Sequence, residues 1–361
     1  MTEPTGQEHL TPVRIVDTSA TERGGFRRCR RQWFLAVVHR LDAQEGNVNF
    51  FLGRIYHSAL EAYYKSLMGP LQGMEFAEEA ALDAYQVAYD LELANMKAQL
   101  GMGWEFGGQQ FRDAGELGIE MLQNYLDRER VDPLLDTVLA VEFRVRCAIP
   151  HPVSGKRAGW LSVQADVVGV KDDELVVVDH KTASRMASSA HLDLDDQLTA
   201  EVYSWWKATG DFPERAIYNV SMKRVPKPPK LLKSGKLSRA VGQDTTVALY
   251  RQAIVDNGLN IGDYIDIIVA LEAREASGED KLFMREATIR TPGQMSAFER
   301  DLFYEYKDMR DVALHPEKAY PNPTSMNCTG CPVRLVCTTI QDDGNVAAVI
   351  KAGYIVADPR R

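Results

Sequence analysis

The feature that most constrains the fold is a group of valine-rich segments near the middle of the chain. Residues 137–148 (TVLAVEFRVRCA) and 160–170 (WLSVQADVVGV) are rich in valine, the first with clear apolar–polar alternation, which predicts two strands. Residues 174–179 (ELVVVD) form a short apolar run that is typical of a buried strand. The polar turn at residues 171–173 separates the last two segments, so we expect a tight hairpin there.

Helical periodicity flanks these strands on both sides. We expect helices at residues 25–41, 51–67, 76–100 and 113–126 before the strands, and at 194–208, 245–276 and 293–311 after them. Two further strands are expected at residues 216–225 and 283–290. This order predicts an α/β fold in which a central mixed sheet is flanked by helices and carries a helical N-terminal lobe.

The chain of 361 residues is long enough for one large domain. We expect a flexible arm at residues 1–17 and a single domain at 18–361. Within it, 18–130 form the helical lobe, 131–225 the catalytic core, 226–311 a basic loop with a helical insertion, and 312–361 a cysteine-rich segment. No apolar run reaches the ~18 residues of a membrane helix, and the first residues do not resemble a signal peptide, so we expect a cytoplasmic protein.

Two aspartates and a lysine mark the end of the expected hairpin. Asp179 and Lys181 are two residues apart and therefore share one side of a strand, and the hairpin brings Asp166 close to Asp179. Two neighbouring carboxylates repel each other unless a cation lies between them, and oxygen ligands of this kind suit Mg²⁺ or Mn²⁺. A lysine beside such an ion favours phosphodiester hydrolysis because it offsets developing negative charge.

Asp166 together with Asp179-His180-Lys181-Thr182 resembles the core of the PD-(D/E)XK nuclease superfamily, in its RecB-like branch. Residues 53–61 (GRIYHSALE) match the glycine–histidine motif of that branch. The resemblance implies a restriction-endonuclease-like core in which His57, Asp166, Asp179 and the main-chain carbonyl of His180 bind the metal ion.

The resemblance extends to two neighbouring segments. Glu142 in the strand AVEFRV matches an acid that often precedes the first aspartate, and it implies a metal ligand or a neighbour of one. The branch also has a glutamine followed four residues later by a tyrosine. Gln197 matches the glutamine and is assigned a catalytic role, but Glu201 stands where the tyrosine is expected. Tyr203 lies six residues after Gln197, about 240° around a helix, and so faces elsewhere.

The five cysteines favour metal binding over a disulfide framework. Cys328, Cys331 and Cys337 have the spacing C-x₂-C-x₅-C, which suits zinc or an iron–sulfur cluster, and the fourth ligand is either Cys29 or Cys147. The chain resembles AddB-like and CRISPR-associated RecB-like exonucleases, in which one N-terminal and three C-terminal cysteines bind a [4Fe–4S] cluster. The resemblance implies that Cys29 is the fourth ligand, with a zinc site as the alternative.

The net charge of −9 argues mildly against nucleic acid, but two local stretches are strongly basic. Residues 222–240 contain seven basic residues and no acid. We expect contacts with DNA phosphates from residues of both stretches, namely Arg27, Arg28, Arg30, Arg31, Lys223, Arg224, Lys227 and Lys230.

These residues together predict a DNA exonuclease that uses Mg²⁺ or Mn²⁺ and carries a structural [4Fe–4S] cluster. Its substrates are expected to be single- or double-stranded DNA ends, with recombination, helicase or CRISPR adaptation proteins as partners and no membrane. The alternatives are a non-catalytic module that binds DNA ends through the same fold, and a nuclease with a zinc site.

Overall fold

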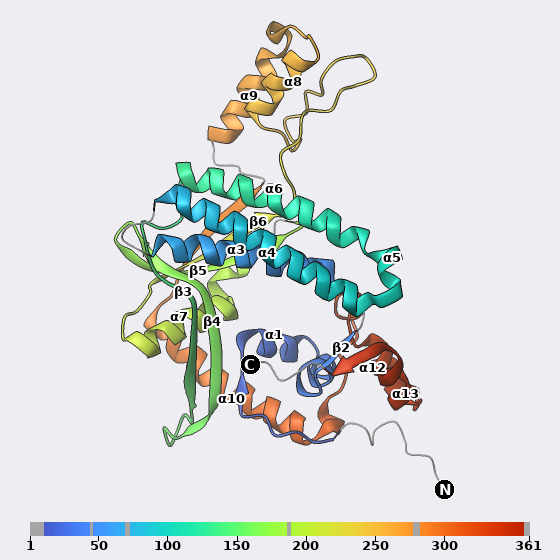
Figure 1. The fold of residues 1–361 in the computed structure, drawn as a ribbon. Helices are drawn as coiled ribbons and strands as arrows, with labels where there is room; N and C mark the ends of the chain where they lie inside the picture. Colours follow the sequence, from blue (N-terminus) through green and yellow to red (C-terminus); the bar gives the residue numbers. More distant parts are fainter. Residues whose placement is uncertain (1–10, 44–45, 69–72, 186–188, 277–281, 357–361) are drawn as a thin grey trace.

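The computed structural model describes residues 11–43, 46–68, 73–185, 189–276 and 282–356. Within these residues, a six-stranded mixed sheet lies at the centre, with helices on both faces (Figure 1). Its strands are β1 (Asp17–Thr18), β3 (Thr137–Pro150), β4 (Arg157–Lys171), β5 (Glu174–Ala183), β6 (Arg215–Met222) and β7 (Phe283–Ile289). The strand order is β1-β4-β5-β6-β7, with β3 also paired to β4. The predicted α/β fold with a central mixed sheet is confirmed.

The direction of each strand follows from its connection. β4 and β5 are antiparallel, and Asp172 and Asp173 form the turn between them with positive φ angles of 52° and 64°. β5 and β6 are parallel because α7 (Asp196–Thr209) crosses between them. β6 and β7 are antiparallel. The tight hairpin expected at residues 171–173 is therefore present.

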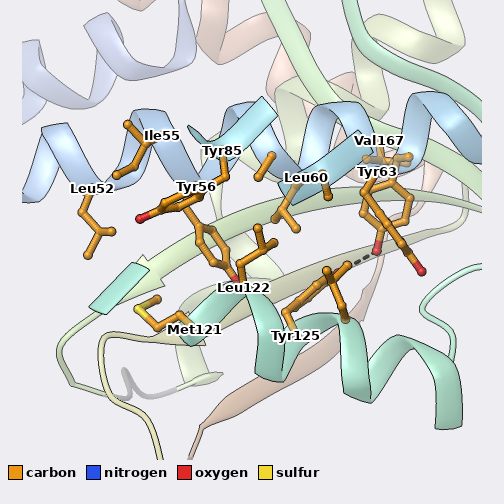
Figure 2. Close-up of a cluster of buried hydrophobic side chains, with 14 of the residues drawn as sticks. Leu52, Ile55, Tyr56, Leu60, Tyr63, Tyr85, Met121, Leu122, Tyr125 and Val167 are labelled. Carbon is orange, nitrogen blue, oxygen red and sulfur yellow. Dashed lines mark hydrogen bonds between the residues drawn. The ribbon is translucent and has the colours of Figure 1, made fainter. Parts of the chain in front are cut away.

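Three long helices cover one face of the sheet: α3 (Val48–Leu67), α4 (Met74–Leu100) and α6 (Gln109–Val131). Their apolar sides pack on Val167, Val176 and Val178 of the sheet. Figure 2 shows how this core joins aliphatic side chains of α3 to the tyrosines Tyr56, Tyr63 and Tyr125. The short elements η2 (Gly101–Gly103) and α5 (Trp104–Gly107) connect α4 to α6.

Two helices cover the opposite face of the sheet. α7 and α10 (Pro292–Leu314) bury Leu198, Val202 and Leu302 against Val168 and Val177 of β4 and β5. Because successive strand residues point to opposite faces, Val176 packs toward α3 and Val177 toward α7. β5 is thus buried on both faces, as its continuous apolar run predicted.

A third core joins the two ends of the chain. The helix expected at residues 25–41 is divided into α1 (Ala20–Arg28), α2 (Arg30–Trp33) and the π-helical turn η1 (Phe34–Val38). The division occurs because Cys29 is extended, with φ −161° and ψ 110°, which ends α1. Phe26, Trp33 and Phe34 pack against Val333 and Val336. The C-terminal elements are η5 (Pro316–Lys318), α11 (Ser325–Cys328), α12 (Arg334–Gln341) and α13 (Val346–Gly353), and a small sheet pairs β2 (Leu41–Ala43) with β8 (Tyr354–Val356).

The expected flexible arm at residues 1–17 falls only partly within the described residues, since 1–10 lie outside them. Its last residues are attached to the body. Val13 N donates to Ala313 O at 2.9 Å, and Asp17 and Thr18 form the edge strand β1 beside β4. The arm therefore ends earlier than expected because its backbone hydrogen bonds to α10 and β4.

The helical insertion between β6 and β7 projects from the body (Figure 1). It contains α8 (Val247–Asp256), η4 (Ile261–Tyr264) and α9 (Ile265–Ala276), and it has a core of its own that includes Tyr250, Ile254, Tyr264 and Leu271. The remaining short helix, η3 (Ser189–Leu194), precedes α7. Among the helices of the described residues, none has the length and apolar character required to cross a membrane.

Candidate active site

The site is built on the end of β5. Val177 belongs to the core under α7, so Asp179 and Lys181, two and four residues later, lie on the same face, whereas His180 points toward α3. Asp179 is buried, and Lys181 is partly exposed. β5 therefore places the carboxylate of Asp179 and the amine of Lys181 on the same face of the sheet.

Asp166 lies where the pairing between β4 and β5 stops. The ladder runs from Lys171 opposite Glu174 to Val167 opposite Val178, so the next pair across the hairpin is Asp166 and Asp179. Asp166 Oδ2 accepts a hydrogen bond of 2.8 Å from the backbone N of His180. Burial raises the pKa of Asp179 to about 7, and the nearby charge of Asp166 adds to this effect. The hairpin thus brings the two carboxylates together, as the sequence predicted.

Gln197, from the first turn of α7, connects the charged groups. Its Nε2 donates to Asp179 Oδ1 at 2.7 Å, and its Oε1 accepts from Lys181 Nζ at 3.2 Å. Lys181 Nζ also donates to Asp179 Oδ1 at 2.8 Å. Burial lowers the pKa of Lys181, but the Asp179 carboxylate outweighs that effect and keeps the amine protonated. Asp179 Oδ2 is buried and has no hydrogen-bond partner among the described residues.

Glu201 is a third buried carboxylate in this network. It lies one helical turn after Gln197, whose Nε2 donates to Glu201 Oε1 at 3.1 Å, while Oε2 has no hydrogen-bond partner in the described residues. Burial raises the pKa of Glu201 well above its ordinary value, and the charges of Asp179 and Asp166 add to the rise. Gln197 and Glu201 line a cavity of about 580 Å³ that also contains Arg144 and Arg146 of β3.

The two histidines occupy different places. His57 of α3 has its Nδ1 3.6 Å from Asp166 Oδ2, and burial lowers its pKa, which favours the neutral form that ligates metals. The His180 ring is buried, stacks on Tyr64 and accepts or donates a 2.9 Å hydrogen bond with Asn219. Only the backbone of His180 is therefore left to face the carboxylates.

Glu142 lies on β3 opposite Asp166, between the pairs Val141–Val167 and Phe143–Ala165. Its φ of 52° interrupts the regular strand, and Gln164 Nε2 donates to its carboxylate. Burial raises the pKa of Glu142 to about 7, with contributions from the charges of Asp166 and Glu61. Glu142 thus borders the carboxylate pair.

The donor set fits a divalent cation. Asp166 lies opposite Asp179 across the hairpin and 3.6 Å from the His57 imidazole, and Asp179 Oδ2 is buried without a hydrogen-bond partner in the described residues, which is costly unless a cation or proton satisfies it. In the described part of the chain, however, no three His, Cys, Asp or Glu side chains are already arranged to hold a metal ion. His57, Asp166 and Asp179 would therefore have to draw together around an ion.

Four of the cysteines gather at the junction of the two chain ends. Asn322 N donates to Cys29 Sγ at 3.4 Å, which places Cys29 beside the C-terminal segment. Burial raises the pKa of Cys337, and the charges of Cys29, Cys331 and Cys328 contribute to the rise, which places the four cysteines in one region; in the described residues, no three of them are arranged to hold a metal ion. The fifth cysteine, Cys147, lies apart in β3, where its thiol donates to Ser204 O.

Some basic residues of the two stretches already contact other groups of the protein, whereas others are exposed to solvent. Arg27 forms ion pairs with Asp196 and Glu305, Arg30 lies over the rings of Phe26 and Tyr320, and Arg31 donates to Ala319 O. Arg28 is exposed beside them. In the second stretch, Lys223 donates to Asn49 and Arg224 pairs with Asp244, whereas Lys227 and Lys230 are exposed.

Three residues of the site were not predicted from the sequence. Glu201 was noted only as a departure from the expected tyrosine. Tyr218 of β6 is in register with Asp179, and burial together with the Asp179 charge raises its pKa. Arg23 is fully buried and pairs with Asp196, the residue before Gln197, and with Glu305 of α10. Tyr203, in contrast, points away and donates to Glu299.

The comparison with known protein families agrees with this geometry. A model of the PD-(D/E)XK nuclease superfamily matches residues 17–338, a span that runs from β1 into α12 and contains every residue of the carboxylate site. No curated protein matches the chain. Because the family model covers most of the chain, the chain belongs to the PD-(D/E)XK nuclease superfamily.

Proposed function

We propose that this protein is a metal-dependent DNA exonuclease that hydrolyses phosphodiester bonds at single- or double-stranded DNA ends. The observation that carries the proposal is the environment of Asp179. One of its oxygens is held by Lys181 and Gln197, while the other is buried without a hydrogen-bond partner among the described residues, and Asp166 lies opposite Asp179 across the hairpin. Such a carboxylate pair is suited to a divalent cation.

Each residue has a distinct role in this proposal. His57, Asp166, Asp179 and the main-chain carbonyl of His180 would hold Mg²⁺ or Mn²⁺. When bound, the ion supplies Lewis acidity toward water and the phosphodiester. Lys181 offsets the negative charge that develops on the phosphate as the leaving oxygen departs. Gln197 fixes the Lys181 amine through its 3.2 Å hydrogen bond and thereby holds the amine near the reacting phosphate.

The exonuclease mode and the biological setting rest on the resemblance to RecB-like exonucleases. Partners from recombination, helicase-coupled repair or CRISPR adaptation fit that resemblance, as does a location in the cytoplasm. The exposed lysines at positions 227 and 230 support contact with DNA phosphates, whereas Arg27, Arg30 and Arg31 are engaged within the protein.

The same proposal includes a [4Fe–4S] cluster bound by Cys29, Cys328, Cys331 and Cys337. It is supported by the position of Cys29 beside the segment that carries the other three cysteines, and by the separate place of Cys147 in β3. A centre bound by these residues would close a loop of about 300 residues, so it would hold the chain ends together without a part in the chemistry.

The activity is tested with linear DNA, single- and double-stranded, labelled at either end, and with a closed circle as the control for endonuclease cleavage. We expect degradation of linear DNA that requires Mg²⁺ or Mn²⁺, and its loss in Asp179→Ala and Lys181→Ala. Lys97→Ala, which changes an exposed lysine of α4, serves as the matched control. Full activity of folded Lys181→Ala protein would refute the assignment. DNA-end binding without cleavage would instead support the non-catalytic module.

The cluster is tested on protein purified without oxygen. We expect iron and sulfide on analysis and a broad absorbance near ~400 nm, typical of thiolate-ligated clusters. Cys337→Ser should lose both, whereas Cys147→Ser should keep them. Stoichiometric zinc without sulfide would replace the iron–sulfur assignment by a zinc site.

A further inference from the structure

The basic segment that follows β6 forms a hairpin at the projecting insertion. Ser238 N donates to Lys230 O at 2.8 Å, and Leu232 N donates to Lys236 O at 2.8 Å. Leu231 and Leu237 form an antiparallel bridge, and Gly235 takes the positive φ of 75° that the tip requires. We call residues 230–238 the basic hairpin.

The basic hairpin is anchored to the insertion through its second arm. Leu237 is buried in the core of the insertion, and its backbone N donates to Tyr264 Oη at 3.2 Å. Ser238 O accepts hydrogen bonds from Tyr250 Oη and from Gln243 Nε2, both at 3.0 Å. Leu231 and Leu232 of the first arm, in contrast, are 51% and 43% exposed, and they form a small apolar surface directly before the turn.

The exposed cations beside these leucines are lysines. Residues 222–240 contain no acid, and the lysines at 227, 230, 233 and 236 are all exposed. The arginines described in the insertion are engaged within it: Arg239 pairs with Asp266, Arg251 pairs with Glu272, and Arg274 donates to backbone carbonyls. The four lysines are therefore the available cations, and their charge is complementary to a polyanion.

The hairpin is attached beside the catalytic strand. Lys223 N, at the end of β6, donates to Ala183 O, two residues after Lys181. The chain between Lys223 and Leu231 spans at most roughly 29 Å when extended. At 3.4 Å per nucleotide along one strand, that distance corresponds to about eight nucleotides. Leu231 is thus within about eight nucleotides of the end of β6, which lies beside β5.

We propose that the basic hairpin is a wedge for duplex DNA ends: its lysines bind phosphates, and Leu231 and Leu232 insert against the terminal base pair and separate the strands. Apolar side chains that insert between bases unstack them, and neighbouring cations hold the backbone in place. The hairpin would also direct one separated strand toward Asp179, and this role rests on the proposed nuclease function. The wedge itself does not depend on cleavage.

Strand separation is measured on Asp179→Ala protein, so that binding is followed without cleavage. The probe is a duplex with 2-aminopurine in its terminal base pair, whose fluorescence rises when the base unstacks. We expect a rise on binding that is lost in Leu231→Ala/Leu232→Ala and kept in Val255→Ala, a change of an exposed apolar residue of α8. Tight binding with no fluorescence rise in the parent protein would refute the wedge.

Phosphate binding is measured by the salt dependence of the duplex dissociation constant. Lys233→Ala/Lys236→Ala should weaken binding and reduce the slope of log K against log salt by about 1.8, because each phosphate contact contributes about 0.9. An unchanged slope would overturn the assignment of these lysines and point to a different partner, such as an acidic protein.

In active protein, the leucine double variant should degrade blunt duplex DNA roughly tenfold more slowly while single-stranded DNA is cleaved at the parent rate. Equal loss on both substrates would contradict a wedge. Absence of all cleavage in the parent would refute the nuclease proposal alone, since the fluorescence and salt measurements would still decide whether the hairpin opens DNA.

Discussion

Glu201 offers the sharpest test of how the site works. Its side chain is 2% exposed, one oxygen accepts from Gln197, and the other has no hydrogen-bond partner among the described residues. We infer that its task is to accept from Gln197 Nε2, which directs Gln197 Oε1 toward Lys181. A neutral acceptor would serve that task as well as a carboxylate. Two variants, Glu201→Gln and Glu201→Ala, therefore separate hydrogen bonding from charge.

The expected magnitudes follow from the contacts. A hydrogen bond to a charged group contributes about 1.5–3 kcal/mol, so its loss in Glu201→Ala should slow cleavage by roughly 10- to 150-fold. Glu201→Gln keeps an acceptor and should cleave at nearly the parent rate. Burial raises the pKa of Glu201 well above its ordinary value, which disfavours the folded state relative to the unfolded state above that ordinary pKa; Glu201→Gln removes this cost and should raise the free energy of unfolding at neutral pH.

The assays are single-turnover cleavage at saturating Mn²⁺ and urea unfolding in metal-free buffer. Glu75→Gln, a change at an exposed position in the first turn of α4, is the matched control and should alter neither quantity. If Glu201→Gln loses as much activity as Glu201→Ala, the charge of Glu201 is required and the acceptor argument is wrong. If it also unfolds more easily than the parent, the carboxylate stabilises the fold.

Three further predictions concern buried charges. Arg285→Met leaves the buried carboxylate of Glu129 without its partner and should lower the free energy of unfolding by about 3–5 kcal/mol; unchanged urea midpoints would contradict this. Arg23→Met should cost less than Arg285→Met in the same assay, because Asp196 and Glu305 reach solvent more than Glu129 does. The pKa of Asp179, raised by burial to about 7, predicts that metal-free protein loses stability as pH rises from about 4 through 7. Asp179→Asn should reduce the decrease of the free energy of unfolding with pH. If that decrease is the same in the variant, other groups cause the pH dependence.

Much of the fold could be predicted because its signals are local. The hairpin of β4 and β5 followed from alternation and from the polar turn, and the burial of β5 followed from three consecutive valines. Asp179 and Lys181 had to share a face because strand side chains repeat every two residues. The helix expected at residues 25–41 was divided at Cys29, where the contact of that segment with residues 322–337 overrides helical periodicity.

The sequence alone determined the catalytic strand, its partner aspartate and the cysteine spacing, since each depends on neighbours along the chain. Only the tertiary structure decided what lies around them. Gln197 reaches Asp179 because α7 packs against β5, and Arg23 meets Asp196 because α1 lies beside α7. The exposed lysines of the basic hairpin and the ion-paired Arg27 all lie in stretches that are equally basic in sequence. Arg27 differs from the lysines in its surroundings, because folding brings it next to Asp196, which is distant along the chain.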